Sequence, residues 1–262
     1  MQYESLELQI TEGLARLTLN QPQIGNPFNA AFCADWGRVA NELAGRRDLR
    51  AVLISAKGRF FSVGGDIGMF SRNLEDLPDR IREWTGGLHL GTARMARLNA
   101  PIIAAVHGSC MGGACALIAG CDLVFSARSA RFGAAYAQIG YSCDAGASFA
   151  LASRMGIARA RRFLLLAEMM DACSAQATGL VDELVDDEQL LAEAEKAAIR
   201  LSQGPTRAYG EIRRLLSRAF SQPLEAQLED EAQSLSRVAA SADAREGIMA
   251  FVEKRSARFQ GS

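Results

Sequence analysis

The sequence has little that would mark a metal-binding, extracellular or membrane protein. Its six cysteines form no C-x-x-C pair and only two histidines accompany them, so we expect neither a zinc site nor a disulfide framework. No apolar run reaches the roughly 18 residues that a membrane span requires. The amino-terminal stretch MQYESLELQI lacks the basic segment and apolar block of a secretory signal. These absences predict a cytoplasmic protein with reduced, mostly buried thiols and no bound metal.

The chain also lacks an excess of charge of either sign. It has 29 Lys and Arg against 30 Asp and Glu, a formal net charge of −1, which argues against nucleic acid as a partner. The phosphate-binding motifs G-x-x-x-x-G-K-[ST] and G-x-G-x-x-G after a strand are absent, and so is the hydrolase motif G-x-S-x-G. What remains is a chain of 262 residues, 49% of them hydrophobic, which is enough for one large core.

Apolar patterning predicts an α/β fold. Buried strands are expected where short apolar runs precede glycine or polar turns, and helices where the apolar period is near 3.6 residues. The expected strands are 4–10 and 14–19, which form a hairpin, then 51–56, 102–106 and 123–125. The expected helices of this part are 28–43 and 79–98. Repeated strand–turn–helix units of this kind favour parallel strands.

The last third of the chain has a different pattern. After Val185 only helical periodicity is found, at 187–202, 205–219, 223–238 and 242–255. We therefore expect two regions, a core at 1–195 and a helical C-terminal region at 196–262.

Two glycine-rich turns share one layout. FFSVGGD at 60–66 and HGSCMGGA at 107–114 each follow a buried strand and precede an apolar helical run. Backbone N–H groups at such turns are unpaired, and glycine allows a ligand to approach them closely. Two such turns side by side would supply two N–H donors to one oxygen atom, which is what an oxyanion hole requires.

These turns and three further segments resemble one family. The segments are FFSVGGDIGMF, AAVHGSCMGGACALIAGCDLVFSARSARFG, GLVDELVDDEQL and FVEKRSARF, in this order along the chain. Together they resemble the crotonase (enoyl-CoA hydratase/isomerase) superfamily from about residue 3 to residue 259. In character the chain is most similar to the ring-1,2-epoxyphenylacetyl-CoA isomerase group, and it shares some site features with 4-chlorobenzoyl-CoA dehalogenase.

The resemblance implies a ββα spiral core and a helical C-terminal region that forms homotrimers, often paired into hexamers. It implies an acyl-CoA thioester as substrate, drawn from fatty acid or aromatic degradation, with no cofactor beyond the coenzyme A of the substrate. The thioester oxygen would lie between the N–H groups of Gly65 and Gly113. Lys254 matches a lysine that meets the coenzyme phosphates, commonly from a neighbouring subunit; the alternative is a solvated helix lysine. Other expected substrate contacts are Ser62, Gly64, Asp66, Met69, Phe70 and Tyr136.

The chain departs from the family pattern at the two glutamates that hold and activate water in hydratases. By match to the motifs, these positions are Ala116 and Tyr136. Neither side chain replaces a carboxylate base. Ordinary hydration of a 2-enoyl thioester is therefore not expected.

One carboxylate remains in the matching region, Asp144, eight residues after Tyr136. The resemblance to the epoxyphenylacetyl-CoA isomerase group makes Asp144 the acid/base. The alternative, from the residues alone, is that Asp144 caps an expected helix at 145–155. Asp66 has a similar alternative, as a residue that secures its glycine turn or caps the next helix.

His89 matches in position the water-activating histidine of 4-chlorobenzoyl-CoA dehalogenase, in which an aspartate matching Asp144 attacks the ring. The alternative is a structural helix histidine; His107 is expected to be structural. The leading hypothesis is an acyl-CoA isomerase that uses Asp144, Gly65 and Gly113. The alternatives are covalent catalysis by Asp144 with His89, a hydratase that lacks both glutamates, and a non-catalytic acyl-CoA binder.

Overall fold

The computed structural model of the protein describes residues 2–72 and 74–262. Within these ranges a six-stranded sheet has the order β1-β2-β3-β4-β6-β9. The β1–β2 pair is antiparallel and turns at Glu12 and Gly13, which both have positive φ, and every later pair in this sheet is parallel. The strands are β1 (Leu6–Thr11), β2 (Leu14–Leu19), β3 (Ala51–Ala56), β4 (Ile102–Val106), β6 (Leu123–Ala127) and β9 (Glu183–Val185). The expected hairpin and the three expected buried strands are thus confirmed.

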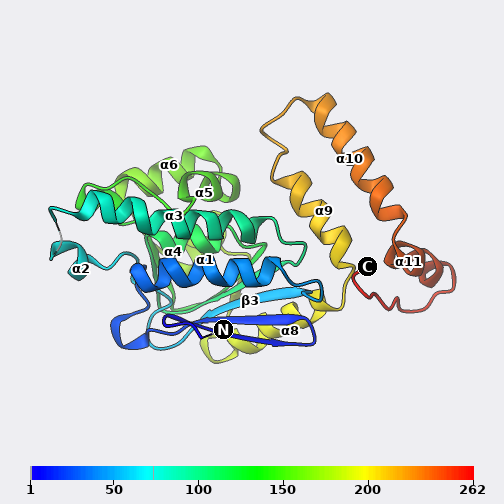
Figure 1. The fold of residues 1–262 in the computed structure, drawn as a ribbon, viewed down its shortest axis with the longest axis horizontal. Helices are drawn as coiled ribbons and strands as arrows, with labels where there is room; N and C mark the ends of the chain where they lie inside the picture. The colour runs from blue at the N-terminus through cyan, green and yellow to red at the C-terminus, as the bar shows by residue number, and fades with distance from the viewer. Residues whose placement is uncertain (1, 73) are drawn as a thin grey trace.

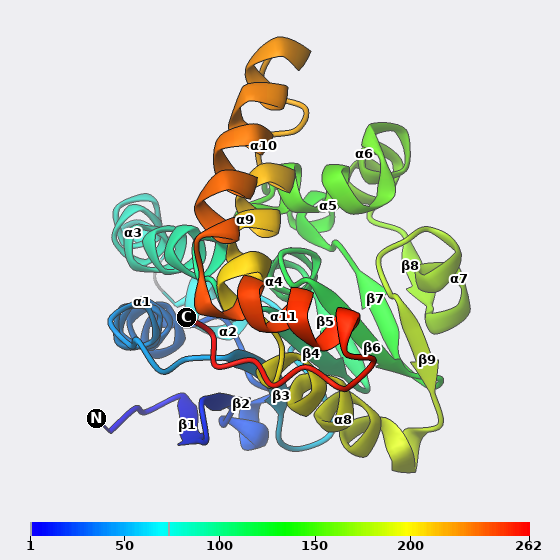
Figure 2. The same cartoon turned by 90° about the vertical axis from the view of Figure 1, so that its right-hand side faces the viewer.

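Helices cover both faces of this sheet. Figure 2 shows α8 (Leu190–Ser202) below the sheet, with α1 (Ala30–Ala44), α3 (Leu77–Ala96) and α4 (Gly113–Ala119) above it. The central strands are buried on both sides, so that Val52, Ile103 and Val106 are fully enclosed. This is why their sequences are continuous apolar runs and do not alternate.

A smaller sheet builds the second layer of the spiral. Within the described chain it contains β5 (Ser109–Met111), β7 (Arg131–Gly133) and β8 (Met169–Asp171) in the order β5-β7-β8. Each of β4 and β6 is followed by one strand of this sheet, and then by α4 in the first case and by α5 (Ala147–Met155) and α6 (Ile157–Leu166) in the second. A further short helix, α7 (Ala172–Ala177), links β8 to β9. The core is therefore the expected ββα spiral.

The C-terminal helices extend from this core (Figure 1). They are α9 (Thr206–Leu216), α10 (Leu224–Ala239) and α11 (Ala242–Val252), close to the bounds that the periodicity predicts. Residue 195, the expected boundary, falls within α8, which packs against β3 and β4. The helices that leave the core begin with α9.

Glycines line the contact between α1 and α3, the two long helices above the sheet. A Cβ on Gly37 would lie 3.1 Å from the carbonyl oxygen of Gly87, and one on Gly91 would lie 2.7 Å from Cδ1 of Trp36. The Trp36 indole N–H also donates to Oγ1 of Thr92 at 3.2 Å. These contacts, which we call the glycine seam, allow the two backbones to approach more closely than larger side chains would permit.

Candidate active site

The two glycine turns lie against each other beyond the carboxyl ends of β3 and β4. A Cβ on Gly64 would lie 3.0 Å from the carbonyl oxygen of Met111, and one on Gly112 would lie 3.7 Å from Cα of Gly64. Both residues have positive φ, +84° at Gly64 and +53° at Gly112, a backbone conformation that glycine adopts without strain. Parallel strands end at the same edge of a sheet, which brings Gly64 into contact with Met111 although they are 47 residues apart in the chain.

The next residue of each turn offers a free backbone donor. Within the described residues, the N–H groups of Gly65 and Gly113 donate no hydrogen bond. Both glycines line one cavity of about 720 Å³. Two unpaired N–H groups at the wall of a cavity are the arrangement that an oxyanion hole requires.

Ser62 shapes the first turn from beneath. Its hydroxyl donates to the carbonyl oxygen of Asn26 at 2.7 Å and accepts the N–H of Gly64 at 3.1 Å. The side chain is fully buried, and Ser62 is not among the residues that line the cavity. In this structure Ser62 therefore supports the turn.

Asp66 begins a short helix. Its carboxylate accepts the N–H of Met69 at 2.8 Å and so caps α2 (Ile67–Ser71). This is the capping alternative that the sequence offered. Neither Asp66 nor Met69 lines the cavity, whereas Phe70 does.

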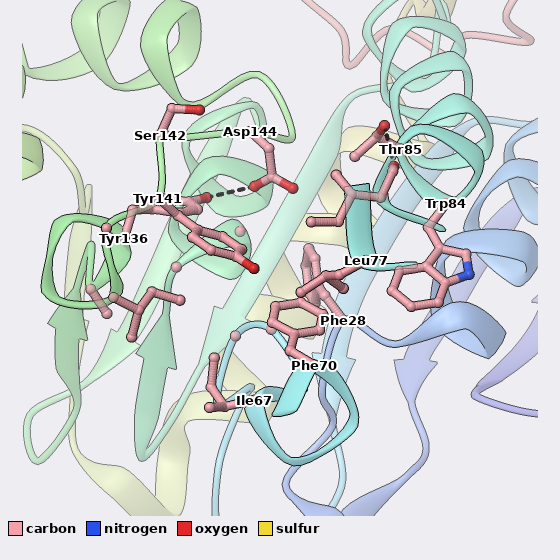
Figure 3. Close-up of a pocket in the computed structure, with 18 of the residues that line it drawn as sticks. Phe28, Ile67, Phe70, Leu77, Trp84, Thr85, Tyr136, Tyr141, Ser142 and Asp144 are labelled. Atoms are coloured by element: carbon pink, nitrogen blue, oxygen red, sulfur yellow. Dashed lines mark hydrogen bonds between the residues drawn. The ribbon is translucent and has the colours of Figure 1, made fainter. Parts of the chain in front are cut away.

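Asp144 lies on the opposite side of the cavity from α3 (Figure 3). The Tyr136 hydroxyl donates to Oδ1 of Asp144 at 2.9 Å. That same oxygen would lie 3.7 Å from a Cβ placed on Gly113, so the carboxylate is close to the second glycine turn. Asp144 is the only Asp, Glu, His, Lys or Arg among the described residues that line this cavity.

The capping alternative for Asp144 is wrong. Helix α5 begins after Gly146 rather than after Asp144, and its start has no side-chain cap. Gly146 has a φ of +87° and Ala145 one of +53°, so the chain turns sharply between the aspartate and the helix. The Asp144 carboxylate is therefore free of the helix end and accepts the Tyr136 hydroxyl instead.

Neutral groups surround this carboxylate. Burial raises the pKa of Tyr136, and the charge of Asp144 raises it further, so the phenol remains a hydrogen-bond donor. Burial, with the same charge, raises the pKa of the Cys33 thiol to about 12. The groups around Asp144 are thus a phenol, a thiol and apolar side chains. Asp144 is therefore the side chain of this lining that is available to accept a proton from a substrate.

His89 does not line the cavity. It lies on α3, and its Nε2 accepts the backbone N–H of Ala145 at 3.1 Å, which places the ring proton on Nδ1. The histidine thus holds the residue next to Asp144, which has the positive φ described above. His107 is also engaged with the backbone, with Nε2 2.9 Å from the carbonyl oxygen of Gly58.

Lys254 follows the end of α11 and is exposed, with a φ of +55°. Within a single chain it does not line the cavity. Ala116, which the resemblance matches to the first hydratase glutamate, is buried and also outside the cavity lining.

Sequence reasoning missed the wall of the cavity that α3 provides. Figure 3 shows Leu77, Trp84 and Thr85 across the cavity from Tyr136 and Asp144. Spacings of three and four residues place the lining side chains on one face of α3, which was the signal available in the sequence. The α3 residues are Leu77, Pro78, Ile81, Trp84, Thr85 and Leu88, and the aromatic residues from other elements are Phe28, Phe70, Tyr136 and Tyr141.

Comparisons with known proteins identify the family of the chain. The profile of the enoyl-CoA hydratase/isomerase family matches residues 9–262. A probable enoyl-CoA hydratase of Rhodobacter capsulatus is 33% identical over 261 residues, which is 100% of both chains. The 1,2-epoxyphenylacetyl-CoA isomerase of Escherichia coli is 33% identical over 258 residues, 96% of this chain and 97% of the relative.

Solved structures have the same fold. A crystal structure described as a putative enoyl-CoA hydratase from Streptomyces coelicolor A3(2) superposes with a TM-score of 0.94 at 29% identity, covering 100% of this chain and 96% of that one. In addition, no helix in residues 2–72 and 74–262 is long and apolar enough to cross a membrane. With a profile match over nearly its whole length, this chain belongs to the enoyl-CoA hydratase/isomerase family.

Proposed function

We propose that the protein is an acyl-CoA isomerase in which Asp144 moves a proton between carbons of the acyl group. One observation carries the proposal: Asp144 is the only acid among the described residues that line the cavity, and it faces the glycine turns that would hold the thioester oxygen. A single carboxylate suits a reaction in which the base that removes a proton also returns it. We propose no cofactor besides the coenzyme A of the substrate, because moving a proton within one molecule changes no oxidation state.

In the proposed reaction, the thioester oxygen accepts hydrogen bonds from the N–H groups of Gly65 and Gly113. The Asp144 carboxylate removes a proton from the carbon next to the thioester carbonyl, and the electron pair of that C–H bond moves onto the oxygen as an enolate that is conjugated with the neighbouring double bond. The same carboxyl group then returns the proton to a different carbon, so atoms and charge balance without water. Each N–H donor to the enolate is worth about 3 kcal/mol in comparable sites.

Hydration is the other reaction of the family, and relatives of both kinds are equally similar to this chain. Water addition needs a base for the water and a proton donor for carbon. The two hydratase positions hold Ala116, which is buried outside the cavity, and Tyr136, whose raised pKa makes it a poor base. These residues favour isomerisation over hydration.

The lining also bears on the acyl group. Phe28, Phe70, Trp84 and Tyr141 contribute aromatic surface, and Phe70 stacks with both Trp84 and Tyr141 at centroid distances of 6.4 and 6.0 Å. We propose an apolar or aromatic acyl group, because such surfaces bind rings and alkyl chains well. The covalent alternative receives less support, because the Nε2 atom of His89 is occupied by the N–H of Ala145.

Asp144→Asn tests the proposal, because it keeps the shape and removes the base. The substrates are 3-enoyl-CoA thioesters, and the readouts are isomerisation and incorporation of deuterium from heavy water. Loss of both by a factor of about 10² to 10⁴ is expected, with thioester affinity retained. The control is Ser142→Ala, a change at another lining residue that is not an acid. Unchanged isomerisation in Asp144→Asn would reject the role of Asp144, and hydration by the wild type alone would reject the isomerase.

Assembly into a homotrimer or a dimer of trimers is also proposed. The C-terminal helical region exposes large apolar side chains, among them Phe220, Leu235 and Phe251, exposed by 99%, 72% and 84%. Such a surface is rare on a monomer and suits burial against a second copy. In that assembly Lys254 would reach the coenzyme phosphates of a neighbouring subunit. Light scattering gives the mass directly, and a monomer at micromolar concentration would contradict this proposal.

A further inference from the structure

A second cavity lies at the opposite edge of the large sheet from the candidate active site. It has a volume of about 590 Å³ and is lined by the ends of α1 and α3, the start of α9 and the chain end near Gly261. Arg50 directly precedes β3 and Ala100 lies just before β4, whereas the glycine turns follow these strands. Since β3 and β4 are parallel, the two cavities lie at opposite ends of these strands and are separated by the length of the strands. Figure 1 shows this region where α9 and the C-terminus meet the core.

Arginine dominates the lining of this second cavity, which we call the arginine cavity. No Asp or Glu from the described part of the chain lines it, and its arginines are Arg46, Arg47, Arg50, Arg94, Arg97 and Arg207. Arg46 pairs with Asp48 at 2.6 Å, but the other five form no ion pair within residues 2–72 and 74–262. Six guanidinium groups are thus gathered in a lining that contains no carboxylate from the described residues, which makes the cavity favourable for an anion.

Three buried polar atoms in the lining have no partner among the described residues. They are Nη1 of Arg50, Nη1 of Arg94 and Oγ1 of Thr206. Thr206 is only 5% exposed, and a buried hydroxyl without a hydrogen bond costs free energy. Arg50 uses its other nitrogens to hold the carbonyl oxygens of Ser202 and Gly204 at 2.9 and 2.7 Å. Its guanidinium is therefore fixed in place while Nη1 remains unpaired.

Asp243, whose charge acts on Arg50, forms its hydrogen bonds with the backbone near the end of the chain and not with the arginine. Asp243 is 3% exposed, and its two oxygens accept the N–H groups of Gln260 and Gly261, each at 2.7 Å. Thr206 is also the first residue of α9, and the first helical hydrogen bond runs from Tyr209 N–H to Pro205 O. The N–H groups of the first turn are thus available to an anion at the positive end of the helix.

We propose that the arginine cavity binds a small anion of the phosphate class that carries more than one charge. Guanidinium groups match phosphate oxygens in bidentate geometry, and the Thr206 hydroxyl and the start of α9 add neutral donors. A volume of about 590 Å³ exceeds what one phosphate fills and suits a pyrophosphate-bearing molecule. The site is separate from the thioester cavity and is independent of the function proposed above.

Calorimetry with inorganic pyrophosphate on the full-length protein tests the site, in the wild type and in the variants Thr206→Val and Arg94→Gln. Thr206→Val is isosteric, and since the hydroxyl has no partner in the described chain, the variant should keep or raise the melting temperature. Both variants should weaken pyrophosphate binding at least tenfold. Arg161→Gln, at an exposed residue of α6 outside both cavities, should change it less than twofold.

Two further measurements separate a phosphate-class ligand from carboxylates. Citrate tests a free carboxylate ligand, and light scattering tests carboxylates supplied by a second copy of the chain. Citrate binding as tightly as pyrophosphate would show a carboxylate site and reject the phosphate class. Equal pyrophosphate affinity in all three variants and the wild type would overturn the proposal. A change of mass in Arg94→Gln without a change in pyrophosphate affinity would also overturn it, because the arginines would then meet carboxylates of a second copy.

Discussion

The hydroxyl of Tyr136 donates a hydrogen bond of 2.9 Å to Oδ1 of Asp144, eight residues further along the chain. Burial keeps this phenol protonated by raising the pKa of Tyr136, so the hydroxyl remains the donor of the pair. The hydrogen bond therefore fixes the direction in which the carboxylate points.

Tyr136→Phe should lower kcat/KM for isomerisation, because the Asp144 carboxylate loses the hydroxyl that orients it. Loss of a hydrogen bond to a charged group costs about 1.5 kcal/mol, which corresponds to about a tenfold loss of rate when it falls on the transition state. The measurement is steady-state kinetics of isomerisation by the variant and the wild type. Unchanged kcat/KM in Tyr136→Phe would contradict the orienting role of the hydroxyl.

His89→Leu should lower kcat because the N–H of Ala145 loses its acceptor. Ala145 has a φ of +53°, and freeing it lets the neighbouring Asp144 leave its position. His89→Gln keeps a side-chain acceptor and should recover most of the activity. Intact-protein mass spectrometry after a substrate quench completes the test. A dead His89→Gln variant that accumulates a covalent adduct would support covalent catalysis and contradict the positioning role.

Gly113→Ala should damage both stability and activity. The added Cβ would lie 2.8 Å from Cδ2 of Phe28, a ring stacked on Phe32 at 4.1 Å. Relief of this contact should cost about 1–3 kcal/mol of unfolding free energy, and displacement of the N–H donor should lower kcat on the order of 100-fold.

Gly86→Ala is the matched control for that substitution. Gly86 lies in α3, and a Cβ there would meet nothing within 4 Å. The change should raise the unfolding free energy by about 1 kcal/mol through helix propensity and leave kcat unchanged. Urea unfolding and steady-state kinetics of the pair separate the two effects. Full activity in Gly113→Ala would remove this N–H from the proposed oxyanion hole.

Acid should weaken the contact between α9 and α10. Hydrogen bonds from Arg237, with help from Arg214, lower the pKa of Glu211 from 4.5 to about 2. Because the folded state holds this group at the lower pKa, its stabilising effect is complete above about pH 4.5 and is lost as pH falls toward 2. The difference in unfolding free energy between wild type and Glu211→Gln should shrink over that range. A difference that stays constant between pH 6 and pH 2 would contradict this assignment.

Much of the fold follows from local pattern. Strands such as β3 and β4 are buried on both faces, so their residues form continuous apolar runs. Such runs can be recognised in the sequence without knowing which elements pack against them. The C-terminal helices were equally visible through their period. The three-residue strands β5, β7 and β8 were not predicted, because a segment that short contains no period, and its pairing is decided by the layer above it.

The site was only partly predictable. The glycine turns were found because the backbone chemistry required glycine itself, as at Gly64 and Gly112. Trp84 and Tyr141 were missed because their roles depend on how α3 faces the loop before α5, and a sequence gives the face of a helix but not what that face meets. For the same reason the contact of His89 with the N–H of Ala145 was not anticipated.

Through the glycine seam, residues that do not line the cavity influence the width of the cavity. The face of α3 that carries Leu77 and Trp84 forms one wall, and the distance of that wall from Asp144 depends on how closely α3 approaches α1. An alanine at Gly91 would meet Trp36 and push α3 away from α1, although Gly91 itself lines no part of the cavity. Preference for larger or smaller acyl groups can therefore evolve at residues that never touch a substrate.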